Sequence, residues 1–102
     1  MISIQIVPKN ELDIYKLLRD KVTHEAKTWN WKNKAKTRLQ HNQSEGYIEV
    51  SSADGILIAK VCPKKKSDLF YNAEKFIGRV ISWFENDIIA INIQFTEDKK
   101  KK

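Results

Sequence analysis

The chain has 102 residues, of which 41% are hydrophobic, and it carries a formal net charge of +6. This size and apolar content suit one domain with a single core. The only cysteine, Cys62, excludes an internal disulfide and fits a reducing compartment, and no apolar run approaches the length of a membrane span. We therefore predict a cytoplasmic protein with one α+β domain over residues 1–98 and a disordered lysine tail over residues 99–102.

The N-terminal segment predicts a strand followed by a helix. Isoleucine occupies every second position of residues 2–6, and Pro8 ends this strand. Asn10 is the expected N-cap of a helix that runs from about residue 11 to about residue 27. The buried stripe of this helix is expected to contain Leu12, Tyr15, Leu17 or Leu18, Val22 and Ala26.

Residues 29–43 allow two interpretations. Alternation over residues 35–41 fits an extra strand, whereas Ala35 and Leu39, four residues apart, fit a continued helix. Because few apolar residues occur here, an extended or loosely ordered connector is the default expectation.

A β-hairpin is predicted next. Residues 47–51 and 56–62 are rich in β-branched and apolar residues and flank a turn at residues 52–55. Gly55 adopts positive φ at little cost, and Asp54 suits the preceding turn position, so the register of the hairpin is well specified.

A second amphipathic helix and a last strand complete the domain. Ser67 is the expected N-cap, with Asp68 in the first turn. Apolar residues at three- and four-residue spacing form the buried stripe of the helix: Leu69, Phe70, Ala73, Phe76, Ile77, Val80, Ile81 and Phe84. Alternating apolar residues then predict the strand: Ile89, Ile91, Ile93 and Phe95.

The element order is therefore β-α-β-β-α-β. This order is typical of a ferredoxin-like two-layer sandwich, in which four antiparallel strands carry both helices on one face. An extra strand over residues 35–41 is the main alternative. The alternating apolar residues of the first and last strands, with Leu57, Ala59 and Val61, should face the helices. The outward residues should be Ser3, Gln5, Ile56, Ile58, Lys60, Asn92 and Gln94.

Two basic segments carry the functional prediction. Cations interleaved with tryptophans suit nucleic acid, because lysine and arginine neutralise phosphates while flat rings stack on bases. The two tryptophan rings are expected to point in opposite directions, so that one is buried and one is free to stack. The same pattern also fits a solvated surface. The predicted nucleic-acid-binding residues are Trp29, Trp31, Lys32, Lys34, Lys36, Arg38, Lys64, Lys65 and Lys66.

Other chemistry has little support in the sequence. His24 and His41 lack the spacing of a zinc site. Cys62 is expected to be a buried or half-buried strand residue. An RNA-recognition motif needs aromatic residues on its two central strands, where the equivalent positions here carry serine, glutamine and isoleucine. We predict neither an enzyme nor a cofactor, metal or small-molecule site.

The predicted function is thus a small basic accessory protein that binds DNA or RNA with little sequence specificity. The alternative is a protein-interaction or homodimerising module, with Ile56, Ile58 and one tryptophan at the self-contact.

Overall fold

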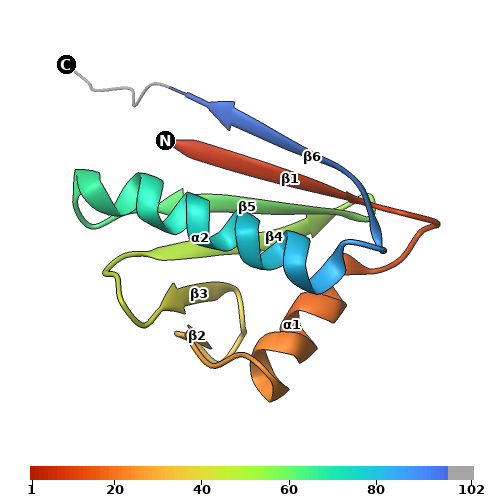
Figure 1. Ribbon diagram of the computed structural model, residues 1–102, viewed down its shortest axis with the longest axis horizontal. Helices are drawn as coiled ribbons and strands as arrows, with labels where there is room; N and C mark the ends of the chain where they lie inside the picture. Colours follow the sequence, from red (N-terminus) through yellow and green to blue (C-terminus); the bar gives the residue numbers. More distant parts are fainter. Residues whose placement is uncertain (97–102) are drawn as a thin grey trace.

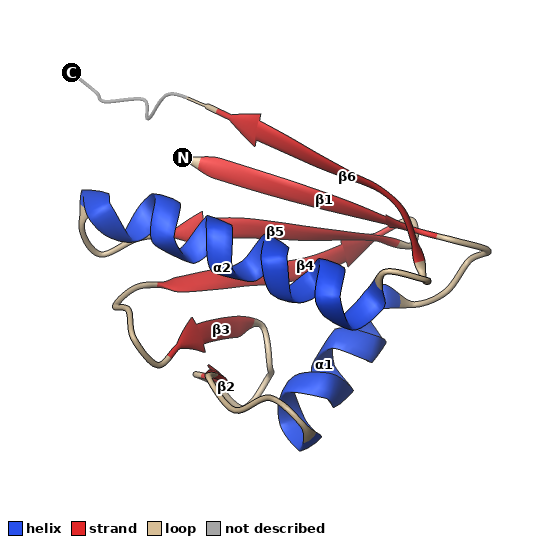
Figure 2. Cartoon of the chain, in the orientation of Figure 1, coloured by secondary structure: helices blue, strands red, loops and turns tan. Residues whose placement is uncertain are grey.

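The structure is a computed structural model that describes residues 1–96. The predicted tail over residues 99–102 lies outside the described residues. In chain order the elements are β1 (Ile2–Pro8), α1 (Ile14–His24), β2 (Trp29–Trp31), β3 (Arg38–His41), β4 (Tyr47–Ala53), β5 (Ile56–Cys62), α2 (Lys66–Phe84) and β6 (Ile88–Phe95) (Figure 2).

The six strands form one open sheet in the order β2-β3-β4-β5-β1-β6. All neighbouring strands are antiparallel. Figure 1 shows α1 and α2 on the same side of this sheet, so the predicted α+β class and antiparallel sheet are confirmed. The expected number of four strands is wrong, because the segment between α1 and β4 adds β2 and β3.

The region with two interpretations thus contains two short strands joined by turns. The extra strand expected over residues 35–41 is present as the shorter β3, and no helix continues through it. β2 has only three residues and pairs with β3 alone, so it shows too little alternation to be predicted from sequence.

The core lies between the helices and one face of the sheet. Ile2, Ile4 and Ile6 are at most 2% exposed, and the inward positions expected in β5 are also buried. Each fully buried large apolar side chain stabilises the fold by about 1.5–3 kcal/mol. The helices contribute Ile14, Leu18 and Val22 from α1 and Ala73, Phe76, Val80 and Phe84 from α2.

Both predicted helix caps are wrong by a few residues. Asn10 and Glu11 adopt φ values of 51° and 63°, outside helical geometry, and Asp13 is the N-cap of α1. The Asp13 carboxylate accepts a hydrogen bond from the Lys16 N–H at 3.1 Å. At α2, Lys65 occupies the cap position. Asp68 lies in the first turn as predicted, and its carboxylate accepts from the Lys65 N–H at 3.2 Å.

Gly46 is required where the start of β4 meets the end of β5. Gly46 and Gly55 both have positive φ, +82° and +81°. A Cβ on Gly46 would lie 2.6 Å from the Cys62 carbonyl oxygen and 2.9 Å from the Lys64 nitrogen, whereas one on Gly55 would meet nothing within 4 Å. A substitution at Gly55 therefore tests the cost of positive φ alone, whereas one at Gly46 adds a collision with neighbouring backbone.

We expect Gly55→Ala to lower the free energy of unfolding by about 1–2 kcal/mol, the cost of a left-handed conformation. Gly46→Ala should lower it by about 3 kcal/mol or more, because the added methyl group also collides with backbone. Urea unfolding of both variants measures the difference. Equal losses would contradict the close approach at Gly46.

A buried histidine lies beside the core. The His41 ring is 4.9 Å from the Trp29 ring and 5.4 Å from the Tyr71 ring, measured between centroids. Its Nδ1 accepts a hydrogen bond from the Gln43 N–H at 3.0 Å, which requires an unprotonated nitrogen. Burial lowers the pKa of His41 below its usual value, and the charges of Lys75 and Arg79 lower it further.

The protein should therefore lose stability as pH falls below about 7, through the ordinary histidine pKa of 6.5. In that range the unfolded chain binds a proton that folded His41 excludes, so acid favours unfolding. His41→Asn keeps an acceptor for the Gln43 N–H but does not titrate, and it should flatten this part of the profile. Urea unfolding at a series of pH values is the measurement. A wild-type profile as flat as that of the variant would refute the role of His41.

Candidate functional site

The two tryptophans of β2 point the same way. Residues two apart on a strand share a face, so the expectation of opposite directions is wrong. Trp29 is 2% exposed and packs edge-on to Phe76 of α2. Trp31 is half-buried, and its Nε1–H donates to the Arg19 carbonyl of α1 at 3.5 Å. Both rings therefore serve the packing between β2 and the helices.

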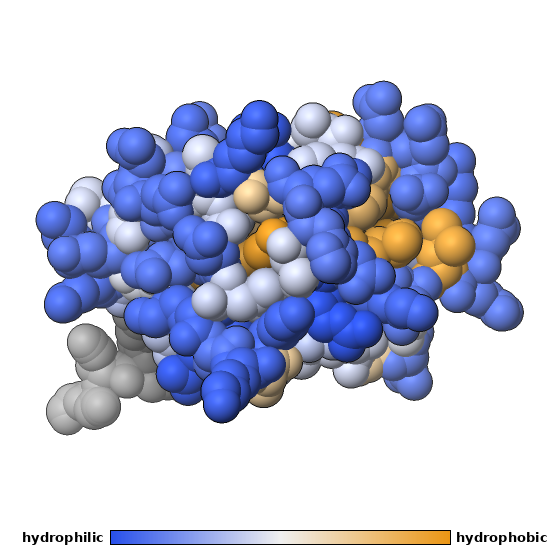
Figure 3. Space-filling model, turned by 90° about the horizontal axis from the view of Figure 1, so that it is seen from below, coloured by the Kyte–Doolittle hydropathy of each residue, from blue (hydrophilic) through white to orange (hydrophobic). Residues whose placement is uncertain are grey.

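The positively charged side chains of the β2–β3 connector and of Arg38 point in two directions. Lys36, with φ of 58°, turns toward α1, where its Nζ donates to the Thr23 hydroxyl at 3.2 Å. Lys32 and Arg38 instead extend over the ring of Tyr47 in β4. Lys34 is exposed. Figure 3 views the molecule from the side of β2 and β3 and shows a mainly hydrophilic surface with apolar residues confined to a band.

Tyr47 is the centre of the group that the fold brings together. The Arg38 guanidinium lies 4.9 Å from the Tyr47 ring centroid, and the Lys32 ammonium lies 5.7 Å from it. Each such cation–π contact at a partly exposed site is worth about 0.5–1 kcal/mol. The ring thus holds two cations from the preceding hairpin in place on the half-exposed start of β4.

Lys60 of β5 and Lys64, two residues beyond its end, extend this group. Cross-strand register aligns Arg38 with Glu49 and Glu49 with Lys60, so these three side chains form one row on the sheet face opposite the helices. The backbone of Lys64 passes close to Gly46, the residue before Tyr47. We call Lys32, Arg38, Tyr47, Lys60 and Lys64 the Tyr47 surface. It holds four cations, with the Glu49 carboxylate as the one acidic group in its rows.

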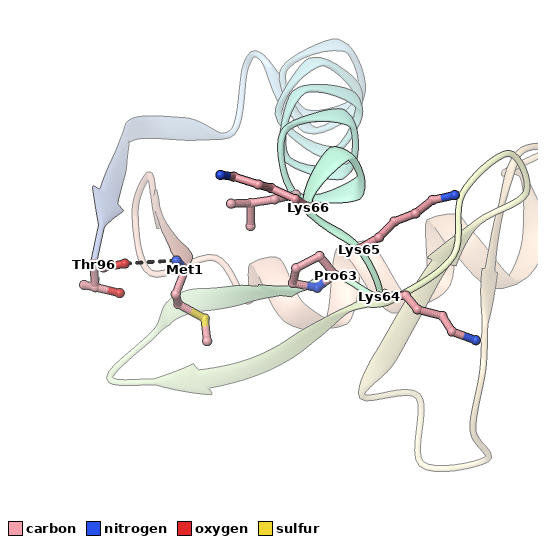
Figure 4. Close-up of a pocket in the computed structure, with 7 residues that line it drawn as sticks. Met1, Pro63, Lys64, Lys65, Lys66 and Thr96 are labelled. Carbon is pink, nitrogen blue, oxygen red and sulfur yellow. Dashed lines mark hydrogen bonds between the residues drawn. The ribbon is translucent and has the colours of Figure 1, made fainter. Parts of the chain in front are cut away.

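The three linker lysines do not converge. They line a hollow at the end of the sheet together with Met1, Leu69 and Thr96. Figure 4 shows their side chains pointing in three directions, with Lys64 directed away from α2. Lys65 also borders a second hollow that contains the acidic residues Glu45 and Asp68. Only Lys64 of the three therefore belongs with the Tyr47 surface.

Cys62 lies beside this surface as a half-buried thiol, in agreement with the sequence expectation. Its backbone pairs with Tyr47. Burial raises the pKa of the Cys62 thiol, and the Glu49 carboxylate raises it further, while Tyr47 and Arg38 oppose the shift. A thiol held neutral in this way is a poor nucleophile.

Sequence reasoning missed Tyr47, and it placed Lys60 on the outward face without making it a site residue. The available signal was strand alternation. With Ile48 and Val50 facing the core, Tyr47 and Glu49 must face outward, on the same side as Lys60 of the adjacent strand. What alternation does not reveal is that Lys32 and Arg38 would fold onto that ring.

Comparison with known proteins gives no further guide, because no family model, no curated protein and no solved structure matches the chain. Within residues 1–96, no group of three or more histidine, cysteine, aspartate or glutamate side chains is placed to hold a metal ion. No helix in the same residues is long and apolar enough to cross a membrane.

Proposed function

We propose that this chain is a small basic accessory protein that binds nucleic acid with little sequence specificity, and that the Tyr47 surface makes the contact. The observation that carries the proposal is the pair of cations held over the Tyr47 ring, at 4.9 and 5.7 Å. Cations beside an aromatic ring can neutralise phosphates while the ring stacks on a base. The sheet face opposite the helices is the part of the fold that offers room for a polymer.

The chemistry of the surface favours weak sequence preference. Lysine ammonium groups bind phosphates as point charges and carry no information about the base. Tyr47 offers a ring that every base can stack on, and stacking requires a base that is not already paired. We therefore expect single-stranded DNA or RNA to bind more tightly than duplex.

The other predicted contact residues take lesser parts in this proposal. Lys34, Lys65 and Lys66 are exposed and add to the long-range attraction of a polyanion. Lys36 is engaged by Thr23, and the two tryptophans pack toward the helices, so we assign these three no direct contact.

We also propose that β4, β5, β1 and β6, together with both helices, form a ferredoxin-like core to which β2 and β3 have been added. Two features support this proposal. The four strands are neighbours in the order β4-β5-β1-β6, and each pair is antiparallel. The hairpin therefore lies beside β1, as a split β-α-β unit requires.

Binding should weaken steeply with salt, and Lys32 should contribute to that dependence. With about four phosphates neutralised, the slope of log K against log salt for a single strand should be roughly −3. Lys32→Ala and Arg38→Ala should each make the slope shallower by about 0.7. Fluorescence anisotropy of a labelled oligonucleotide across a salt series measures this.

Lys75→Ala is the matched control for Lys32→Ala. Lys75 lies 5.5 Å from the Tyr71 ring on α2, so the variant removes the same charge from the same kind of contact on the helix side. It should leave the slope unchanged. Equal effects of the two variants, or no retention of DNA or RNA fragments at low salt, would reject the proposed surface.

Stacking on Tyr47 should contribute affinity that salt does not remove. We expect Tyr47→Leu to weaken binding of a single strand by about 1–3 kcal/mol, or roughly 5- to 150-fold, with little change in slope. Duplex binding should change less, because paired bases cannot stack on the ring. Titrations of both forms with the variant test this. A variant that binds single strands as tightly as wild type would exclude stacking.

A further inference from the structure

The two edges of the sheet differ in how they are protected. The β2 edge has three residues and is flanked by Lys27 and Lys32. Short length and nearby lysines are the usual means by which proteins prevent an edge strand from pairing with another chain. β6, at the other edge, has eight residues and no charged residue or proline. By the same physical criteria, β6 is open to strand addition.

The side chains of β6 are also unusually exposed for their type. Ile89, Ile93 and Phe95 are 66%, 43% and 70% exposed. Ile93 pairs with Ile4 and Phe95 with Ile2, so both lie on the helix side of the sheet, as the sequence predicted, but α2 does not cover them. Ile89 lies at the irregularity where β6 shifts register against β1.

Helix α2 continues this apolar surface. Phe70 and Ile81 were expected in the core but are 57% and 47% exposed. Ile81 lines one hollow with Ile89 and Ile91, so this side of α2 faces β6. In Figure 1 the first turn of α2 and the end of β6 lie at the same end of the molecule. Phe70 and Ile81 are about three helical turns apart, so they share one face of α2. We call Phe70, Ile81, Ile89, Ile93 and Phe95 the β6 strip.

The β6 strip supplies part of the area that a stable dimer needs. At about 150–250 Å² for a large side chain, the five exposed fractions correspond to roughly 500 Å² of surface. A standard stable interface buries about 800 Å² on each partner. The five side chains therefore supply more than half of that area before the backbone edge of β6 is counted.

We propose that β6 pairs antiparallel with β6 of a second copy, so that two six-stranded sheets join into one. Antiparallel partners on the same face must have residue numbers of equal parity. Pairing Ile91 with Ile93 satisfies this rule, and the same register sets Ile89, at the irregularity, beside Phe95. The two-fold axis then passes through Asn92, which faces its own copy.

Charge opposes a second copy less at the β6 edge than at the β2 edge. Two chains of net charge +6 repel each other, and the β2 edge would bring lysines together. The eight residues of β6 carry no charge, so this edge avoids that repulsion locally. Raising the salt concentration should therefore strengthen self-association, because screening removes the remaining repulsion between the two copies.

Cysteine cross-linking tests the register directly. In a Cys62→Ser background, Asn92→Cys places two thiols opposite each other, within the Cα separation that a disulfide tolerates. Mild oxidation should give a linked dimer. Ser51→Cys in the same background is the control, because Ser51 is also exposed on a strand but lies on β4. Cross-linking of both variants to the same extent would overturn the proposal.

Light scattering of the unmodified chain gives the second test. The mass should rise with concentration from 12.0 kDa toward twice that value. Ile93→Lys should weaken the dimer on the order of tenfold or more, since it sets a charge opposite an isoleucine at two symmetric positions. Phe95→Lys should act in the same direction, and circular dichroism checks that both variants fold.

Ala53→Lys is the control for these lysine variants, because it adds the same charge at an exposed strand position on β4. The mass that light scattering gives for this variant should equal that of wild type at the same concentration. A wild-type chain that stays monomeric at high concentration, or a dimer that Ile93→Lys does not weaken, would refute pairing through β6. Binding of an unrelated peptide strand by such a monomer would assign the edge to a different partner.

Discussion

Two helices cover only one face of this sheet, and the placement of every exposed feature follows from that constraint. The apolar residues of β1 and β5 alternate with polar or half-exposed ones, so a single face requires cover. α1 packs against β2, β4 and β5, and α2 packs against β5. The opposite face is left to solvent, and α2 leaves Ile93 and Phe95 at the end of β6 exposed. The proposed Tyr47 surface and the unprotected edge both depend on the same incomplete cover.

The sequence predicted best where periodicity is long and buried. β1, the β4–β5 hairpin and α2 each repeat their pattern over seven or more residues, and burial on one face fixes that pattern. The helix starts were wrong because several capping residues compete within a few positions. Asp13 caps α1, and Asp68 accepts from the N–H of the cap residue Lys65 at α2. Periodicity cannot show which acceptor reaches which N–H. The number of strands was wrong because β2 is too short to carry a pattern.

The site was less predictable than the fold, because contacts between cations and a ring depend on three-dimensional register. Lys32 and Arg38 are six residues apart and meet at Tyr47 only because β2, β3 and β4 are successive neighbours in the sheet. Lys36 lies between them in sequence and turns the other way, since its positive φ redirects the chain toward α1. A run of positive charge in the sequence therefore overstated how many side chains share one surface.

The two proposals involve different parts of one sheet and respond to salt in opposite ways. Phosphate contacts at the Tyr47 surface release counterions and weaken as salt rises, whereas pairing of β6 brings two positive chains together and gains from screening. A two-fold axis perpendicular to the sheet leaves the open faces of both copies on the same side. Two Tyr47 surfaces on one continuous face would bind a long polymer more tightly than either alone, with no new contact to the polymer. Self-association would thus compensate for the small number of cations that each copy presents.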